Sequence, residues 1–161
     1  MPKKASEGDF YEVSHGTEGK LVYFQLCHKK KGGYVVWAIH KIYNERPSIN
    51  QLSDATNSDG FYCMISLLNL LKANQVTCIG NKHPIDKLCK FPVFKNGMSF
   101  HGEVIKRWWL WDGNNDTEYL GEIAEIKSYP LKQIISLDIL TNRVLRKWTP
   151  ELCHVDPKEL Y

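Results

Sequence analysis

Residues 61–74, FYCMISLLNLLKAN, carry the strongest secondary-structure signal in the chain. Their apolar members fall on one broad arc at helical spacing, whereas Ser66 and Asn69 lie on the opposite side. The members of the arc are Phe61, Met64, Ile65, Leu67, Leu68 and Leu71. Ser58 or Asp59 can cap the segment by accepting an early backbone N–H. The pattern predicts an amphipathic helix over 61–74 that buries this arc against a sheet.

Two segments upstream of this helix predict a β-hairpin. Residues 21–27 and 34–43 are rich in Val, Ile and aromatic side chains, which favour strands. Between them, residues 29–33 (KKKGG) end in two glycines that give the backbone freedom to reverse. The next segment, 44–60, has the Pro, Ser, Asp and Asn residues typical of turns and little apolar pattern, so we expect a long loop there.

A second hairpin is predicted downstream, between residues 99–111 and 117–126. The linking residues, 112–116 (DGNND), tolerate left-handed backbone angles and therefore favour a tight turn. Ahead of this hairpin, 76–79 is consistent with a short strand. Residues 80–92 contain two prolines and are expected to be irregular.

The end of the chain is expected to contribute a strand and a short helix. Residues 135–139 alternate between apolar and polar side chains, which favours a strand, and 141–148 favours a short basic helix that ends before Pro150. Together these elements predict an α+β fold, with a mostly antiparallel sheet built from two hairpins and packed against one main amphipathic helix.

The composition is that of an ordinary globular protein. The chain has 161 residues, of which 43% are hydrophobic and 24% are charged, and its 12% aromatic residues argue against disorder. A single domain over 1–161 is expected, with the polar residues 1–9 as a disordered leader. The formal net charge of +3 is too small for a dedicated duplex-DNA binder, so charge alone selects no partner.

The cysteines indicate a reducing compartment. Five residues, Cys27, Cys63, Cys78, Cys89 and Cys153, are odd in number and widely spaced, and the N-terminus lacks the apolar stretch of a secretion signal. We therefore expect free thiols and a cytoplasmic protein, with the nucleus as the alternative. No apolar run approaches the roughly twenty residues that a membrane span requires, so no membrane partner is expected.

The most specific catalytic candidate is a thiol site of Cys63, His101 and Asp112. Cys63 stands at the start of the predicted helix, where partial positive charge favours a thiolate, His101 can accept the proton, and Asp112 can orient the imidazole. This order resembles transglutaminase-like and papain-related enzymes over about fifty residues, and the resemblance implies a hydrolase or transferase. The small residues that precede the cysteine in those families are missing. The structural alternative is that Cys63 only fills space in the core.

A metal site is a weaker possibility. Cys78, His83, Cys89 and His101 offer the sulfur and imidazole ligands that zinc prefers. None of their spacings is the tight two-residue separation that makes a zinc motif specific, so we expect neither metal nor cofactor. The chain also lacks a phosphate-binding glycine loop, a GxSxG elbow and an HExxH motif, which excludes the enzyme classes that depend on them.

The favoured function is recognition of a macromolecule by a non-catalytic binding domain. On a strand, Arg107, Trp109 and Trp111 point to one face, while Lys106 and Trp108 point to the other. Trp and Arg anchor protein interfaces and stack on nucleic-acid bases. The hairpin-tip residues Lys29, Lys30 and Lys31 can add phosphate contacts. The partner is then a protein, as for an inhibitor or immunity protein, or a nucleic acid; the structural alternative is that the tryptophans are buried in the core.

Overall fold

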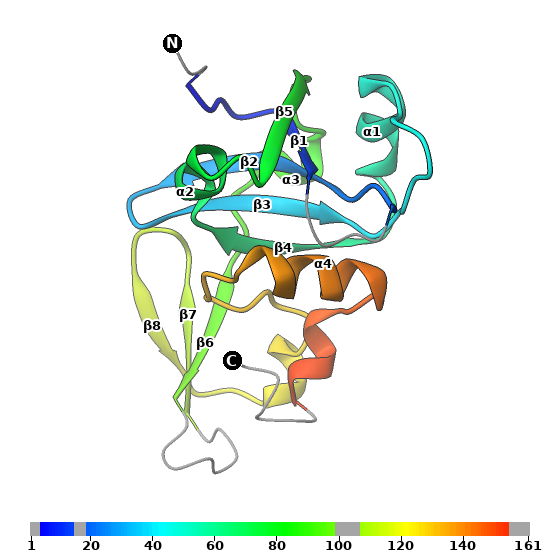
Figure 1. Ribbon diagram of the computed structural model, residues 1–161. Coiled ribbons are helices and arrows are strands. Elements are labelled where there is room, and N and C mark those ends of the chain that lie inside the picture. The colour runs from blue at the N-terminus through cyan, green and yellow to red at the C-terminus, as the bar shows by residue number, and fades with distance from the viewer. Residues whose placement is uncertain (1–3, 15–18, 99–106, 155–161) are drawn as a thin grey trace.

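The computed structural model describes residues 4–14, 19–98 and 107–154, and these form two antiparallel sheets with flanking helices (Figure 1). The larger sheet has the strand order β4-β3-β2-β1-β5 and the smaller one β6-β7-β8. The strands are β1 (Asp9–Val13), β2 (Tyr23–Lys30), β3 (Gly33–Ile39), β4 (Gly60–Ile65), β5 (Val76–Asn81), β6 (Phe94–Met98), β7 (Arg107–Trp111) and β8 (Asp116–Tyr119). The helices are α1 (Ile49–Ala55), α2 (Leu67–Lys72), α3 (Asp86–Cys89) and α4 (Leu137–Leu145), with 3-10 turns at Ile123–Ile126 and Pro150–His154. The predicted α+β class is confirmed.

The first hairpin is formed by β2 and β3. The chain reverses at Gly32, which has a φ of 97° that a residue with a Cβ rarely adopts. Lys29 and Lys30 belong to β2, so the turn is shorter than the segment 29–33 that the sequence predicts. The pairing shifts between Leu26 and His28, and this irregularity accommodates one extra residue in β2.

The predicted helix over 61–74 is wrong in its first half. Residues up to Ile65 form strand β4, which pairs with β3 from Tyr34↔Ile65 to Ile39↔Gly60, and only Leu67–Lys72 is helical. Both faces of β4 are covered by other elements, so its apolar side chains do not show the simple alternation of a half-buried strand. Leu68, which belongs to the predicted buried arc, is 48% exposed.

The helix that covers the larger sheet is α4, the longest of the described helices. In Figure 1, α4 lies beside β4 of the larger sheet. Its Leu137, Leu140 and Val144 share a buried cluster with Val36 of β3 and Phe61 of β4. Ser136 caps α4, because its side-chain oxygen accepts a hydrogen bond from the backbone N–H of Ile139. Burial of one apolar face by a helix was thus expected correctly, but from another part of the chain.

The opposite face of the larger sheet is covered at one end by α1. Leu52 and Ala55 of this helix pack against Phe10, Tyr23 and Ile39. The helix begins at a reciprocal cap, in which the Ser48 hydroxyl accepts from the N–H of Gln51 and the Gln51 side chain accepts from the N–H of Ser48. The segment 44–60 therefore contains a helix where a loop was predicted. The seven residues of α1 are too few to show a clear helical period of apolar side chains in the sequence.

Residues 4–9 belong to the fold and are not a frayed leader. Ala5 is buried, and the backbone N–H of Gly8 donates to the carbonyl oxygen of Leu26 at 2.8 Å. On the other side, the N–H of Lys82 donates to the carbonyl oxygen of Gly8 at 3.1 Å. Polar side chains add to these contacts, since the Asn81 amide donates to the Asp9 carboxylate at 2.8 Å. The polar composition of the segment did not predict this placement, because main-chain groups can pair whatever side chains they carry.

The second hairpin exists, with different strand lengths and a third strand. β7 and β8 pair from Trp111↔Asp116 to Trp108↔Tyr119, and β6 adds to the other edge of β7. Residues 123–126 form a 3-10 turn where a strand was predicted, and 99–106 lie outside the described residues. The predicted strand over 135–139 is also wrong: Ile134 makes one isolated bridge with Met64, and α4 then begins. Across the described part of the chain, no helix is long and apolar enough to span a membrane.

Candidate binding surface

Strand β7 has one buried side and one partly exposed side. Trp108 is 4% exposed and belongs to the main buried cluster, whereas Arg107 is exposed and Trp109 and Trp111 are partly exposed. Trp108 therefore lies on one face and Arg107, Trp109 and Trp111 on the other, as their alternation predicts, whereas Lys106 lies outside the described residues. It arises because successive side chains of a strand point to opposite faces. The second face also touches the core at one end, where Trp111 packs against the buried cluster of Val35, Met64 and Phe94.

A cationic side chain lies close to the ring of each of the two partly exposed tryptophans. The guanidinium carbon of Arg107 lies 5.6 Å from the centre of the Trp109 ring, and the ammonium nitrogen of Lys132 lies 4.8 Å from the Trp111 ring. At such distances a cation is attracted to the electron-rich face of the ring. Lys132 was not among the predicted site residues, because it reaches β7 only through the tertiary placement of the segment that contains it.

Both cations are also paired with carboxylates of β8. Arg107 donates two hydrogen bonds to Glu118, at 2.8 and 3.1 Å, and Lys132 contacts Asp116 at 2.7 and 2.9 Å. Glu118 is the register partner of Trp109, so the sheet itself fixes this arrangement. Both cations are therefore already engaged by carboxylates of the same sheet.

Phe91 extends this surface to the first hairpin. Its ring lies 5.4 Å from that of Trp111 and 5.2 Å from that of His28, and the ammonium nitrogen of Lys30 lies 5.0 Å from it. A Cβ on Gly113 would meet Phe91 at 2.8 Å and Lys30 at 3.0 Å, so the turn before β8 and the end of β2 are in close approach. We call Phe91, Trp109 and Trp111, with Arg107, Lys132 and Lys30, the aromatic face.

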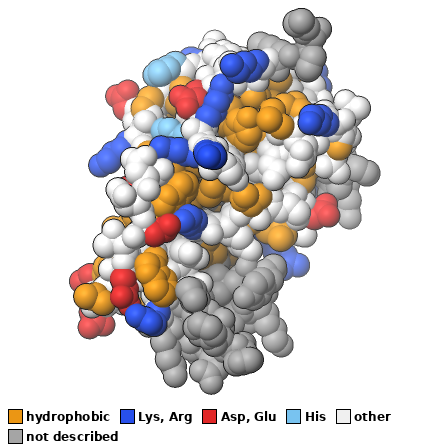
Figure 2. All heavy atoms as spheres, turned by 90° about the vertical axis from the view of Figure 1, so that its left-hand side faces the viewer, with side chains coloured by type: hydrophobic (Ala, Val, Ile, Leu, Met, Phe, Trp, Pro, Cys, Tyr) orange, Lys and Arg blue, Asp and Glu red, His pale blue; other side chains and the backbone are white. Residues whose placement is uncertain are grey.

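The three lysines of the hairpin are placed differently from one another. Lys30 joins the aromatic face, whereas Lys29 and Lys31 have exposed side chains. The backbone N–H of Lys29 donates to the carboxylate of Glu7 at 3.1 Å. In Figure 2, apolar patches lie among Lys, Arg, Asp and Glu side chains on the visible side.

The position of Cys63 does not suit the predicted thiol site. Cys63 lies within β4, not at a helix start, and burial raises the pKa of its thiol to about 12. Asp112 accepts hydrogen bonds from the N–H groups of Asn115 and Asn114, both at 2.8 Å, which lower the pKa of its carboxyl and hold the β7-β8 turn. His101 lies outside the described residues. The observation that motivated the thiol-enzyme hypothesis, a cysteine at a helix N-terminus, is therefore absent.

Two of the four candidate metal ligands come together. The sulfur of Cys89 lies 3.5 Å from Nε2 of His83 and donates to the carbonyl oxygen of Pro84 at 3.2 Å. Cys78 lies on β5, and His101 is again outside the described residues. Within residues 4–14, 19–98 and 107–154, no group of three or more His, Cys, Asp or Glu side chains is arranged to hold a metal ion.

No protein-family model, curated protein or solved structure matches the chain. The class that the fold defines is an α+β protein with two antiparallel sheets. The functional proposal for this chain therefore rests on the chemistry of the aromatic face.

Proposed function

We propose that the chain is a non-catalytic binding domain whose aromatic face contacts a partner protein. The observation that carries the proposal is the pair Trp109 and Trp111, which remain partly exposed on a sheet face although Trp is highly buried on average. Half-exposed Trp side chains beside Arg are the residues that most often dominate the binding energy of protein interfaces.

The charges favour a protein over a nucleic acid. A nucleic-acid surface draws most of its affinity from unpaired cations that replace counterions on phosphates. On the aromatic face, Arg107 and Lys132 are already paired with Glu118 and Asp116, and only Lys30 has no such carboxylate partner among the described residues. A mixed surface of rings, cations and carboxylates is complementary to a protein that presents its own polar rim.

The test begins with site-specific photocrosslinking in cells. A benzoylphenylalanine residue replaces Trp109, and a matched control carries it at Asp54, an exposed residue of α1, the helix at the other end of the larger sheet (Figure 1). A protein that is captured from position 109 but not from position 54 is then purified. Its binding to the unmodified chain is measured by calorimetry.

The affinity of the purified partner is then measured for variants of the chain. We expect Trp109→Ala and Trp111→Ala to weaken binding by about 2 kcal/mol each, roughly thirtyfold, while Asp54→Ala leaves it unchanged. Circular dichroism establishes that each variant is folded. Unchanged affinity in the tryptophan variants contradicts the proposal, and so does a crosslinked species that nuclease removes, because it assigns the face to nucleic acid.

A further inference from the structure

A cleft lies between the start of α4 and helix α2, apart from the aromatic face. It encloses about 410 Å³, a volume within the usual range of small-ligand sites. It is lined by Ser66, Leu70, Gln75, Ile134, Ile135, Ser136, Leu137 and Asp138. None of these residues belongs to the aromatic face, so the two proposals can fail separately.

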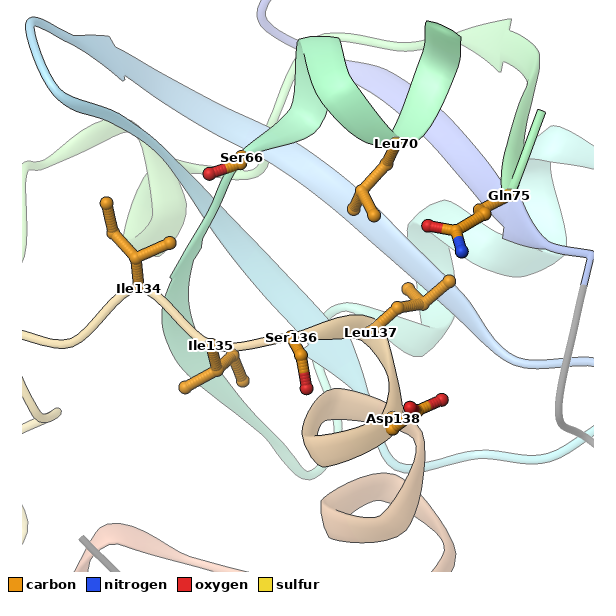
Figure 3. Close-up of a pocket in the computed structure, with 8 residues that line it drawn as sticks. All are labelled: Ser66, Leu70, Gln75, Ile134, Ile135, Ser136, Leu137 and Asp138. Carbon is orange, nitrogen blue, oxygen red and sulfur yellow. The ribbon is translucent and has the colours of Figure 1, made fainter. Parts of the chain in front are cut away.

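The floor and walls of the cleft are apolar. Ile135 and Leu137 are buried beneath it, and Ile134, on its rim, is 49% exposed. Leu70 of α2 and Leu137 of α4 point into the same space from opposite sides (Figure 3). This arrangement accommodates a short aliphatic chain that would exchange water for apolar contacts.

The polar groups of the cleft are available to a ligand. Ser136 is engaged as the cap of α4. In contrast, no hydrogen bond joins the side chains of Ser66, Gln75 or Asp138 to another described residue. These side chains offer hydrogen-bond acceptors above the apolar floor, the arrangement that orients a ligand in most small-molecule sites.

The charge of the cleft selects a cation. Asp138 is the only charged side chain among the described residues that line it. The first turn of α4 favours an anion instead, because the N-terminus of a helix carries about half a positive charge. The full negative charge of Asp138 outweighs this half charge, so the cleft favours an ammonium group over a carboxylate.

We propose that this cleft binds an aliphatic ammonium group, with the alkyl chain between Leu70 and Leu137 and the nitrogen beside Asp138. The same chemistry can come from the lysine side chain of a polypeptide or from a free amine. Three probes share a four-carbon chain and differ only in their end group: n-butylammonium, 1-butanol and pentanoate. A fourth probe, Nα-acetyl-lysine methylamide, presents the ammonium on a peptide unit.

Binding is measured by NMR on the full chain with labelled methyl groups. We expect n-butylammonium to shift the methyl signals of Leu70, Ile134 and Leu137 at lower concentration than 1-butanol, and pentanoate to bind most weakly. Asp138→Asn should weaken binding of n-butylammonium about two- to fivefold, within the range of an exposed ion pair, and leave 1-butanol unchanged. The control Asp54→Asn removes an exposed carboxylate of α1 and should change neither.

Several results would overturn the assignment. They are equal binding of the three chain-matched probes, preferred binding of pentanoate, an Asp138→Asn variant that binds n-butylammonium normally, or no methyl shift with any probe. The lysine derivative identifies the source. If it binds at least as well as n-butylammonium, the natural ligand is a lysine side chain, and if the cleft excludes it, the ligand is a free amine.

Discussion

Adjacent tryptophans of β7 are predicted to contribute very differently to stability. Trp108 and Trp109 are neighbours in the same strand and differ by which face of the sheet they occupy. Trp108 is 4% exposed within the main cluster, whereas Trp109, among the described residues, packs on none of the three buried clusters and contacts Arg107. Replacing each by alanine therefore compares a core position with a surface position in the same strand.

The expected magnitudes follow from the buried area. An aromatic side chain removes about 200 Å² from water, and at about 25 cal/mol per Å² this gives an upper value near 5 kcal/mol for Trp108. Core truncations of this size cost about 3–5 kcal/mol in measured series. Because Trp109 keeps part of its ring in water and adds no buried cluster contact, Trp109→Ala should cost about 1 kcal/mol.

The assay is equilibrium unfolding in urea, followed by circular dichroism at a wavelength that reports the backbone. Total stabilities of about 5–15 kcal/mol are normal, so Trp108→Ala should remove a large fraction of the free energy of unfolding and Trp109→Ala a small one. The slope of the free energy against urea should stay constant in both variants. If Trp109→Ala costs as much as Trp108→Ala, or more, the assigned faces of β7 are reversed and the aromatic face does not exist.

Three further perturbations have defined outcomes. The Arg46 guanidinium lowers the pKa of the Glu12 carboxyl. This pair should therefore stabilise the fold fully above the unfolded pKa of about 4.3, and the stabilisation should be lost as pH falls through the folded pKa. In unfolding experiments at a series of pH values, Glu12→Gln should lose less of its free energy of unfolding in acid than the unmodified chain does. Of Cys27, Cys63, Cys78 and Cys89, the four cysteines whose side chains the structure describes, Cys89 should react first with a thiol reagent at neutral pH. Cys63 should react only on unfolding, since burial raises the pKa of its thiol to about 12. Ser136→Ala should lower the free energy of unfolding by about 1 kcal/mol, because it removes the cap of α4.

Each of these expectations has an internal control. The prediction for Glu12 is contradicted if the free energy of unfolding falls equally in acid for Glu12→Gln and the unmodified chain. Rapid modification of Cys63 in the folded chain, shown by mass spectrometry of labelled peptides, would contradict the second and revive the thiol-enzyme hypothesis. Ser136→Thr retains the capping hydroxyl, so it should be less destabilised than Ser136→Ala.

The local reversals were predictable because they depend on few neighbouring residues. Gly32 and Gly113 adopt positive φ values that other residues rarely adopt, and the segments that flank Gly32 are rich in the Val, Ile and aromatic residues that favour strands. The alternation of side chains along a strand placed Trp108 and Trp109 on opposite faces of β7 correctly. Phe91 and Lys132 could not be assigned to the aromatic face from the sequence, because they reach it through contacts between distant segments.

The sequence by itself determined the α+β class, the two hairpins and the alternation of β7, since propensity and turn chemistry act over a few residues. Only the tertiary structure decided that residues up to Ile65 form a strand and that α4 supplies the covering helix. An apolar run of this length is compatible with both states, and the choice depends on whether a neighbouring strand offers its backbone hydrogen bonds. For β4 that neighbour is β3, and six pairs of residues are in register between the two strands. This pairing, together with the packing of apolar side chains on both faces of β4, outweighs the helical spacing of its side chains.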